Sequence, residues 1–308
     1  MNGVLVIDKP AGPTSHDVVA VVRRAIGLTR VGHTGTLDPL ATGVLPLVIG
    51  SATRLASFMS GADKEYVARI RIGAATETYD AESAASGVGG RGEMPKLAAV
   101  SALTEAAVAQ AVSTFAGRYL QTPPPYSAKK VGGTPAYKLA RRGKPVDVKP
   151  VEVSATEIEL RSYADGLAEV RLVCSSGFYV RSLAHDLGQR LGCGAHLEGL
   201  QRTRAGPFRL EESVPLGDLV AEGPAVARRT LIPMSGLLTH LFAVVLTEAG
   251  AERARHGAQL RPQDVTQSTL PSEGVVGGPV RLLDGDGSLV GLADAKPDGL
   301  LHPVVVLV

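Results

Sequence analysis

The pattern of apolar and polar residues along the chain predicts short strands interleaved with amphipathic helices. Residues 4–7 form an apolar run that stops at the turn signals of DKPAGPTS, and residues 64–73 alternate in the manner of a half-buried strand. Two further runs, 151–160 and 167–173, flank Asp165–Gly166, a pair that is typical of a β-hairpin turn. These segments predict at least four strands in the first 175 residues.

Helical spacing of apolar residues marks three further segments. The first has Ser15 as its expected N-cap and stops at Gly27, the second spans about 101–115, and the third spans 180–191. Strands and helices are mixed without regular βαβ alternation. We therefore expect an α+β fold with a mixed, mainly antiparallel sheet flanked by helices.

A change of composition near Phe242 separates a compact, strand-rich C-terminal segment. Residues 280–283 and 289–293 flank an Asp-Gly-Asp-Gly turn, and residues 302–308 follow as a terminal strand. A chain of 308 residues is long enough for two domains. We expect a larger domain over residues 1–241 and a small β domain over residues 242–308.

Composition excludes several classes of protein. With 44% hydrophobic and 20% charged residues, the chain has the balance of an ordinary globular protein, and no apolar run reaches membrane-spanning length. The N-terminal MNGVLVIDKP lacks the basic and long apolar regions of a secretory signal. Cys174 and Cys193 have neither CxxC spacing nor a matching histidine cluster, so we expect no disulfide framework and no zinc site. A cytoplasmic location is the simplest expectation.

Positive charge is concentrated in one segment, although the formal net charge is only +2. Residues 118–149 hold eight basic residues against the single acid Asp147, which gives 8 − 1 = +7, and QRTRAGPFR contributes three more arginines without an acid. Such a concentration is what neutralising a phosphate backbone requires, although a solvated loop would look similar. Tyr119, Tyr126 and Tyr137 offer stacking faces between these charges, and they favour RNA.

The segment VGHTGTLDPLATGVLPLVIG (residues 31–50) is the strongest candidate for chemistry. It contains neither GxGxxG nor GxxxxGK, so it does not predict a nucleotide-phosphate loop. Taken alone, Asp38 before Pro39 could simply cap a helical turn, and His33 could be a structural histidine. Tyr66 occupies one face of the alternating segment 64–73, where a core residue is expected. Arg181 lies near a predicted helix start, where the helix dipole disfavours a cation, but a solvated arginine would cost little there.

The full set of motifs resembles the TruB family, the synthases that make pseudouridine in the T loop of tRNA. The N-terminal motif is GVLVIDKPAGPTSHDVV, and RVGHTGTLDPLATGVLPLVIGSATR matches the motif around the family's catalytic aspartate. KEYVARIRIGAATETYDAE, PPYSAKKVGGTPAYKLARRGK, SGFYVRSLAHDLG and AHLEGLQRTRAGPF follow in the family's order. One departure is Phe178, where the family usually has a smaller residue. The C-terminal VRLLDGDGSLVGLA resembles a small, barrel-like β module of the PUA type.

The resemblance implies a role for each matching residue. Asp38 would be the catalytic aspartate, Tyr66 would stack on the target base, and Arg181 would pair with the aspartate. His33 would contact RNA beside the site, and Lys9 and Leu200 would shape the pocket. The expected RNA contacts in the basic segment and beyond it are Lys129, Lys130, Arg141, Arg142 and Arg202.

The implied reaction breaks the N1–C1′ bond of uridine, turns the base and joins C5 to C1′, so it needs no cofactor and no metal. The implied partner is tRNA, bound at its T stem-loop and at its acceptor end through the C-terminal domain, with no membrane and no obligate protein partner. Two other hypotheses remain at this point. One is an RNA-binding or RNA-folding factor whose catalytic machinery is vestigial, and the other is a synthase for a different RNA.

Overall fold

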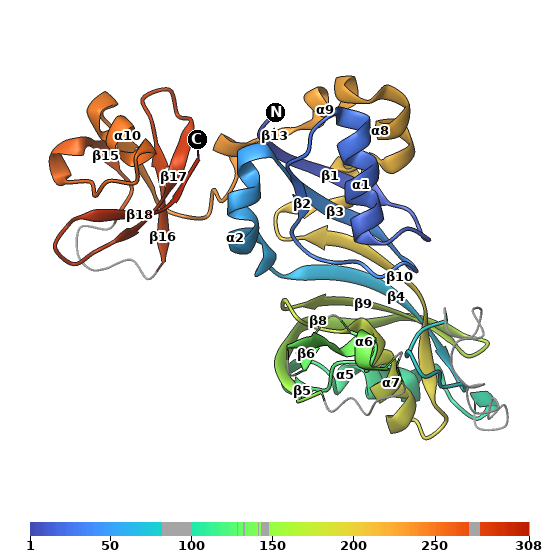
Figure 1. Cartoon of the computed structure of the whole chain (residues 1–308). Helices are drawn as coiled ribbons and strands as arrows, with labels where there is room; N and C mark the ends of the chain where they lie inside the picture. Colours follow the sequence, from blue (N-terminus) through green and yellow to red (C-terminus); the bar gives the residue numbers. More distant parts are fainter. Residues whose placement is uncertain are drawn as a thin grey trace.

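The structure is a computed structural model that describes residues 1–81, 100–127, 129–131, 133–140, 142, 148–270 and 278–307. One large mixed sheet extends through the first three quarters of the chain, and a separate five-stranded sheet forms the C-terminal part (Figure 1). The spatial order of the main path in the large sheet is β12 (Val214–Pro215), β1 (Gly3–Lys9), β3 (Ala41–Ile49), β10 (Ala195–Ala205), β4 (Lys64–Ile72), β9 (Leu167–Cys174), β8 (Val151–Ala164) and β5 (Gly117–Gln121).

Most neighbouring strands of this sheet are antiparallel, but β1 pairs with β12 and β3 pairs with β10 in parallel. Three short strands pair with this sheet outside the main path: β2 (Val31–His33), β11 (Phe208–Arg209) and β13 (Ile232–Pro233). The helices that accompany the sheet are mostly short, and they are α1 (Ser15–Ile26), η1 (Gly50–Leu55), α2 (Ala56–Ser60), α5 (Glu105–Ser113), α7 (Val180–Arg190), η2 (Leu210–Glu212), α8 (Leu216–Glu222), α9 (Pro224–Thr230) and η3 (Met234–Gly236). The predicted α+β class and mainly antiparallel sheet are confirmed.

Local sequence explains several of these elements. The turn between β8 and β9 has positive φ angles at Asp165 (50°) and Gly166 (72°), as a tight hairpin requires. Helix α1 is capped by Thr14, whose side chain accepts from the backbone of Asp17 while Asp17 bonds back. The prediction of Ser15 as the cap is therefore wrong by one residue. Helix α5 begins after its N-cap Thr104 and is shorter than the predicted helix over residues 101–115.

The two faces of the large sheet are buried differently. On one face, α1, α5 and α7 cover inward side chains such as Leu5, Leu47 and Ile70, which form the main core. On the other face, Val4 and Val48 pack with residues from η1, α2 and the C-terminal sheet in a second cluster. Because β1 and β3 are buried on both faces, nearly all of their residues are apolar.

The C-terminal sheet has the order β15 (Val265–Ser268), β14 (Ala243–Leu246), β16 (Pro279–Leu283), β17 (Leu289–Ala295) and β18 (Leu301–Val306), with α10 (Glu248–Arg255) and η4 (Pro262–Asp264) beside it. It has a core of its own, and its first strand begins directly after the predicted boundary at Phe242. Leu289 and Leu292 also pack into the cluster behind β1 and β3. The small C-terminal sheet domain therefore packs against the larger one through this cluster.

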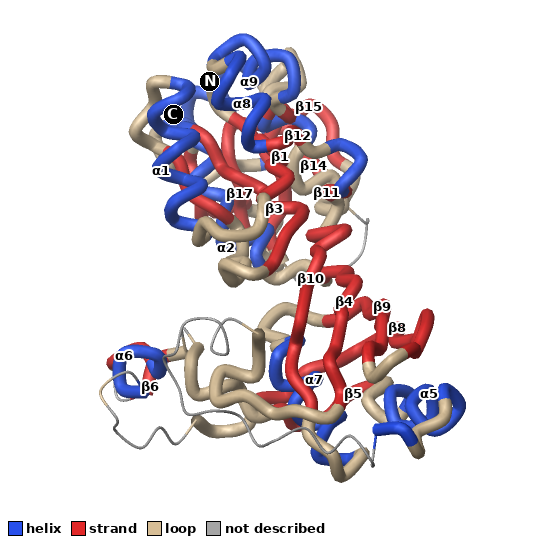
Figure 2. The backbone as a smooth tube through the Cα atoms, turned by 90° about the vertical axis from the view of Figure 1, so that its right-hand side faces the viewer, coloured by secondary structure: helices blue, strands red, loops and turns tan. Residues whose placement is uncertain are grey.

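The basic segment contains a small two-stranded unit, β6 (Lys130–Val131) and β7 (Thr134–Pro135), followed by the short helix α6 (Ala136–Ala140). In Figure 2 this unit stands away from the large sheet, on the side where α1 also lies. Across the described ranges, no helix combines the length and apolar character that crossing a bilayer requires.

Candidate active site

Asp38 lies in the loop between β2 and β3, here called the Asp38 loop (residues 34–40). The backbone N–H of Ala41 donates to the carbonyl of Asp38 at 3.0 Å, and the chain then enters β3. The loop is thus a turn that opens a strand. Asp38 thus begins a single turn, as the alternative reading of Asp38–Pro39 expected, but the chain enters a strand after it and not a helix.

Two buried polar side chains hold this loop from the N-terminal part of the chain. Lys9, fully buried at the end of β1, donates from Nζ to the carbonyls of Pro39 (3.2 Å) and Ala41 (2.7 Å). Ser15 accepts from the backbone N–H of Leu37 at 2.8 Å and donates to its carbonyl at 3.0 Å. Buried backbone groups need such partners, so these contacts fix the course of the loop on both sides of Asp38.

Arg202 holds the same loop from β10. Its Nε donates to the carbonyl of Val44 at 2.7 Å, and its two terminal nitrogens donate to the carbonyls of Gly35 (3.2 Å) and Thr36 (3.4 Å). The side chain is only 1% exposed. The prediction that Arg202 contacts RNA is therefore wrong, because its donors are turned inward and are used by the protein. Counting charges along a sequence does not separate buried arginines from exposed ones.

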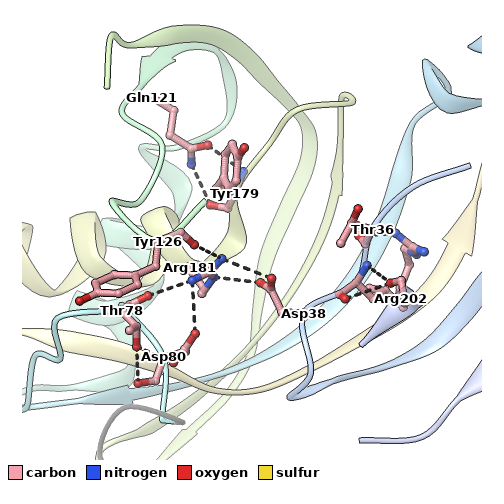
Figure 3. A network of polar contacts seen from close by, with 11 residues as sticks. Thr36, Asp38, Thr78, Asp80, Gln121, Tyr126, Tyr179, Arg181 and Arg202 are labelled. Carbon is pink, nitrogen blue, oxygen red and sulfur yellow. Dashed lines mark hydrogen bonds and ion pairs between the residues drawn. The ribbon is translucent and has the colours of Figure 1, made fainter. Parts of the chain in front are cut away.

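The structure places Arg181 directly against Asp38 (Figure 3). Nε of Arg181 lies 2.9 Å from Oδ2 of Asp38, although outside hydrogen-bond geometry, and Nη2 donates to Oδ1 at 3.3 Å. The side chain of Arg181 is 8% exposed, whereas that of Asp38 is 34% exposed. The carboxylate is thus the accessible member of the pair, and the guanidinium lies behind it.

A second carboxylate, Asp80, shares this guanidinium. Nη1 of Arg181 donates to Asp80 Oδ2 at 3.4 Å and to the carbonyl of Thr78 at 3.2 Å, and Nη2 donates to the carbonyl of Tyr126 at 3.1 Å (Figure 3). The hydroxyl of Thr78 donates to Asp80 Oδ1 at 2.6 Å. Asp80 was not predicted from the sequence, since one acid in a turn segment carries no periodic signal.

Arg181 lies in the first turn of α7, and the start of this helix is held by Gln121, a residue that was not predicted from the sequence. Gln121, fully buried at the end of β5, accepts from the backbone N–H of Tyr179 at 2.8 Å and donates to its carbonyl at 3.0 Å (Figure 3). These two bonds tie β5 to the residue that precedes the helix. The feature that could have identified Gln121 is an amide on the inward face of a strand, where an apolar residue would be usual.

Phe178, the departure from the family pattern, lies just before this helix. Its ring packs edge-on against Tyr119, with centroids 6.2 Å apart and planes at 88°. The larger side chain therefore extends an aromatic contact with β5 while Arg181 still reaches Asp38.

Tyr66 lies on β4 with its side chain on the inward face, and it is 8% exposed. Burial raises the pKa of its phenol, and the positive charge of Arg202 opposes that rise. The negative charge of Asp38 adds to the rise, which places the phenol within electrostatic reach of the carboxylate. Tyr66 is therefore a core residue whose phenol feels the charge of Asp38.

His33 and Leu200 border the same region. His33 ends β2, and its ring meets that of His16 edge-on at 5.3 Å. Burial lowers the pKa of His33, and the charges of His16 and Arg202 lower it further, so the imidazole is neutral at pH 7. Leu200 lies on β10 between Ala41 of β3 and Ala68 of β4, at the point where the Asp38 loop enters the sheet.

The predicted RNA contacts of the basic segment are only partly described. Lys129 is half-buried beside the two-stranded unit, and Arg142 is exposed. Lys130 contributes its backbone to β6. Arg141 lies outside the described residues. Within the ranges that are described, no group of three or more His, Cys, Asp or Glu side chains is arranged to hold a metal ion.

Comparison with known proteins assigns the family. Residues 23–180 match the family model described as TruB family pseudouridylate synthase (N terminal domain), and residues 181–239 match tRNA pseudouridylate synthase B C-terminal domain. The tRNA pseudouridine synthase B of Solibacter usitatus is 41% identical over 310 residues, covering 100% of both chains. That of Xanthomonas campestris pv. campestris is 40% identical over 305 residues, covering 98% of this chain and 93% of the other.

Solved structures agree with this assignment. A chain from an H/ACA RNP bound to a substrate RNA containing 2′-deoxyuridine superposes with a TM-score of 0.73 at 26% identity, covering 99% of this chain and 85% of that one. A chain from the archaeal box H/ACA sRNP Nop10–Cbf5 complex gives the same TM-score at 25% identity, covering 100% of this chain and 86% of that one. The sequence motifs, the fold and the relatives coincide, and the chain belongs to the TruB family of pseudouridylate synthases.

Proposed function

We propose that the chain isomerises uridine to pseudouridine at position 55 in the T loop of tRNA, with Asp38 as its catalytic carboxylate. The observation that carries the proposal is the Asp38–Arg181 pair, in which the carboxylate is partly exposed and the guanidinium is buried. The relatives that match over nearly the full length are tRNA pseudouridine synthases, which supports tRNA as the substrate.

The chemistry needs a carboxylate near the glycosidic bond. Asp38 would attack the sugar or the base, or assist formation of a glycal intermediate, and each of these routes starts from an ionised aspartate. Arg181 supplies the counter-charge that a carboxylate in a partly buried position requires. The remaining donors of Arg181 are directed at Asp80 and at two backbone carbonyls, so the guanidinium is held in place before substrate arrives.

The target base must leave the stacked T loop to reach Asp38, which costs a few kcal/mol. Stacking on Tyr66 would return roughly 1–3 kcal/mol of this cost. Tyr66 is largely buried in the free protein, so entry of the base has to uncover its ring. His33 borders the space that the extruded nucleotide leaves, and its neutral imidazole is suited to hydrogen bonding with RNA.

The rest of the chain would supply affinity for tRNA. The basic segment (residues 118–149) would follow the phosphate backbone of the T stem. The C-terminal domain, residues 242–308, would act as a PUA-type module at the acceptor end. Its hydrophobic packing against the back of β1 and β3 keeps it attached to the larger domain, residues 1–241.

Tritium release from C5-labelled uridine in an unmodified tRNA transcript tests the proposal. Wild-type protein should release tritium from one uridine, and a transcript with cytidine at position 55 should release none from that site. Asp38→Asn should bind the transcript within about 3-fold of wild type and release no tritium. Turnover by Asp38→Ala would refute the assignment of Asp38. Repeating the assay with an isolated T stem-loop tests how much of the tRNA is required.

A further inference from the structure

Arg202 occupies a central position that none of the proposed catalytic roles explains. It is the largest fully buried side chain in the described structure. It lies on β10, where its backbone registers with Gly43 of β3 on one side and with Tyr66 of β4 on the other. The ladder between β10 and β4 is irregular directly after Arg202. One residue therefore joins the strand that follows the Asp38 loop to the strand that carries Tyr66.

The guanidinium joins the first part of the Asp38 loop to the strand that follows it. Its donors reach the carbonyls of Gly35 and Thr36 before Asp38 and the carbonyl of Val44 after it. The planar fork of arginine offers several donors in fixed directions, which suits three carbonyls on two segments. A lysine would keep the charge but would not reach all three acceptors at once.

The same residue is paired with Tyr66 across the ladder between β10 and β4. The charge of Arg202 opposes the rise in the pKa of the Tyr66 phenol that burial causes. The Asp38 loop and the expected stacking residue thus share one buried cation. Burying a charge is costly, and an apolar side chain of similar volume would often serve stability as well or better, so fold stability alone does not account for an arginine here.

We infer that Arg202 is a positioning residue for the proposed isomerisation, which holds the Asp38 loop in place relative to the strand that carries Tyr66. The inference rests on the proposed function. Because its guanidinium is buried beneath the loop, Arg202 acts through Asp38 and Tyr66 and does not touch the RNA. A displacement of about 1 Å at a reacting group can cost about 100-fold in rate.

The test compares Arg202→Lys and Arg202→Met with Arg171→Met. Arg171 serves as the control arginine, because it lies on β9, beyond β4 from β10, and its ion pairs with Glu65 (2.8 Å) and Glu157 (2.7 Å) involve none of the contacts of Asp38 or Arg202. Single-turnover tritium release and tRNA affinity are measured for each folded variant, together with Tm. Both Arg202 variants should bind tRNA within about 3-fold of wild type. Their single-turnover rates should fall by about 100-fold.

A spectroscopic readout separates positioning from a general loss of stability. In protein labelled with [13Cζ]tyrosine, the Tyr66 signal, assigned with Tyr66→Phe, should shift in Arg202→Lys and stay in place in Arg171→Met. Arg202→Lys keeps the charge and most of the stem, so it carries the test if Arg202→Met does not fold.

Two outcomes overturn the inference. One is turnover at the wild-type rate in Arg202→Lys, and the other is an equal loss of rate in Arg171→Met at the same Tm. Failure of the proposed function is a different result, because wild-type protein would then release no tritium at all.

Discussion

Replacing Arg181 by methionine tests whether Asp80 depends on this guanidinium. Both side chains are almost fully buried, at 8% and 6% exposure, whereas Asp38 is partly hydrated. Removing Arg181 leaves the charge of Asp80 without this cation, and the carbonyls of Thr78 and Tyr126 lose a donor. Breaking a buried pair from one side typically costs about 3–5 kcal/mol. We expect Arg181→Met to lower the free energy of unfolding by about that amount.

A second substitution shows how much of that loss is electrostatic. Asp80→Asn removes the buried charge and keeps an oxygen that can accept from the Thr78 hydroxyl. In the double variant, the cost should therefore fall to about 1–2 kcal/mol, which is that of the lost hydrogen bonds. The coupling energy is the sum of the two single losses minus the loss of the double variant, so it should exceed about 2 kcal/mol.

Urea unfolding of the four proteins measures this coupling. The chain has no tryptophan, so far-UV circular dichroism is the appropriate signal, and equal m-values are needed for the comparison. Strict additivity of the two single losses would refute the argument that Asp80 and Arg181 stabilise each other. Turnover provides a second check, because the double variant should regain stability and remain inactive. Recovery of activity together with stability would mean that Arg181 serves the fold alone.

Three further predictions follow from other parts of the structure. Charge reversal at Lys129 and Arg142 should weaken tRNA binding and flatten its salt dependence by about 0.9 in log–log slope per lost phosphate contact, and an unchanged slope would contradict the role of the basic segment. Burial raises the pKa of Asp186 from 3.8 to about 6, so its ionisation destabilises the folded protein as pH rises between these values. Asp186→Asn should therefore add about 1 kcal/mol at pH 7.5, after allowance for partial solvent screening, and lose that gain below about pH 4, which thermal melts at both pH values will show. Leu292→Ala, in the cluster behind β1 and β3, should cost about 2–5 kcal/mol in urea unfolding, and a loss below 0.5 kcal/mol would argue against a shared core.

Much of the fold could be predicted because its signals are local. The alternation of residues 64–73, the Asp165–Gly166 turn and the apolar spacing of 180–191 each report the neighbours of a residue in the chain, and all three elements are present. Strands β3 and β10 were not predicted. β3 is buried on both faces and has no alternation, and β10 mixes buried and half-buried polar residues along its length.

The site could be predicted from the sequence only in part, because it is formed by contacts between residues that lie far apart in the chain. Asp38 and Arg181 are separated by 143 positions, and it was the family motifs that linked them. Asp80 and Gln121 were missed because each is one polar residue whose importance comes from its burial. Arg202 was predicted to contact RNA because its burial is not visible in the sequence. A cluster of arginines does not reveal which members face inward. Burial is a property of tertiary packing, and it decides the role of all three residues.

The described contacts also indicate which part of the site has to move when RNA binds. Lys9, Ser15 and Arg202 fix the Asp38 loop from within the protein, and all three are buried, so the loop is not free to withdraw. Tyr66 is nevertheless too enclosed to receive a base in the free protein. Tyr126 contacts the same site through its carbonyl, which accepts from Arg181. If a base is to stack on Tyr66, the Asp38 loop is therefore the part of the site that the fold holds in place, and the cover over the Tyr66 ring is the part that has to give way.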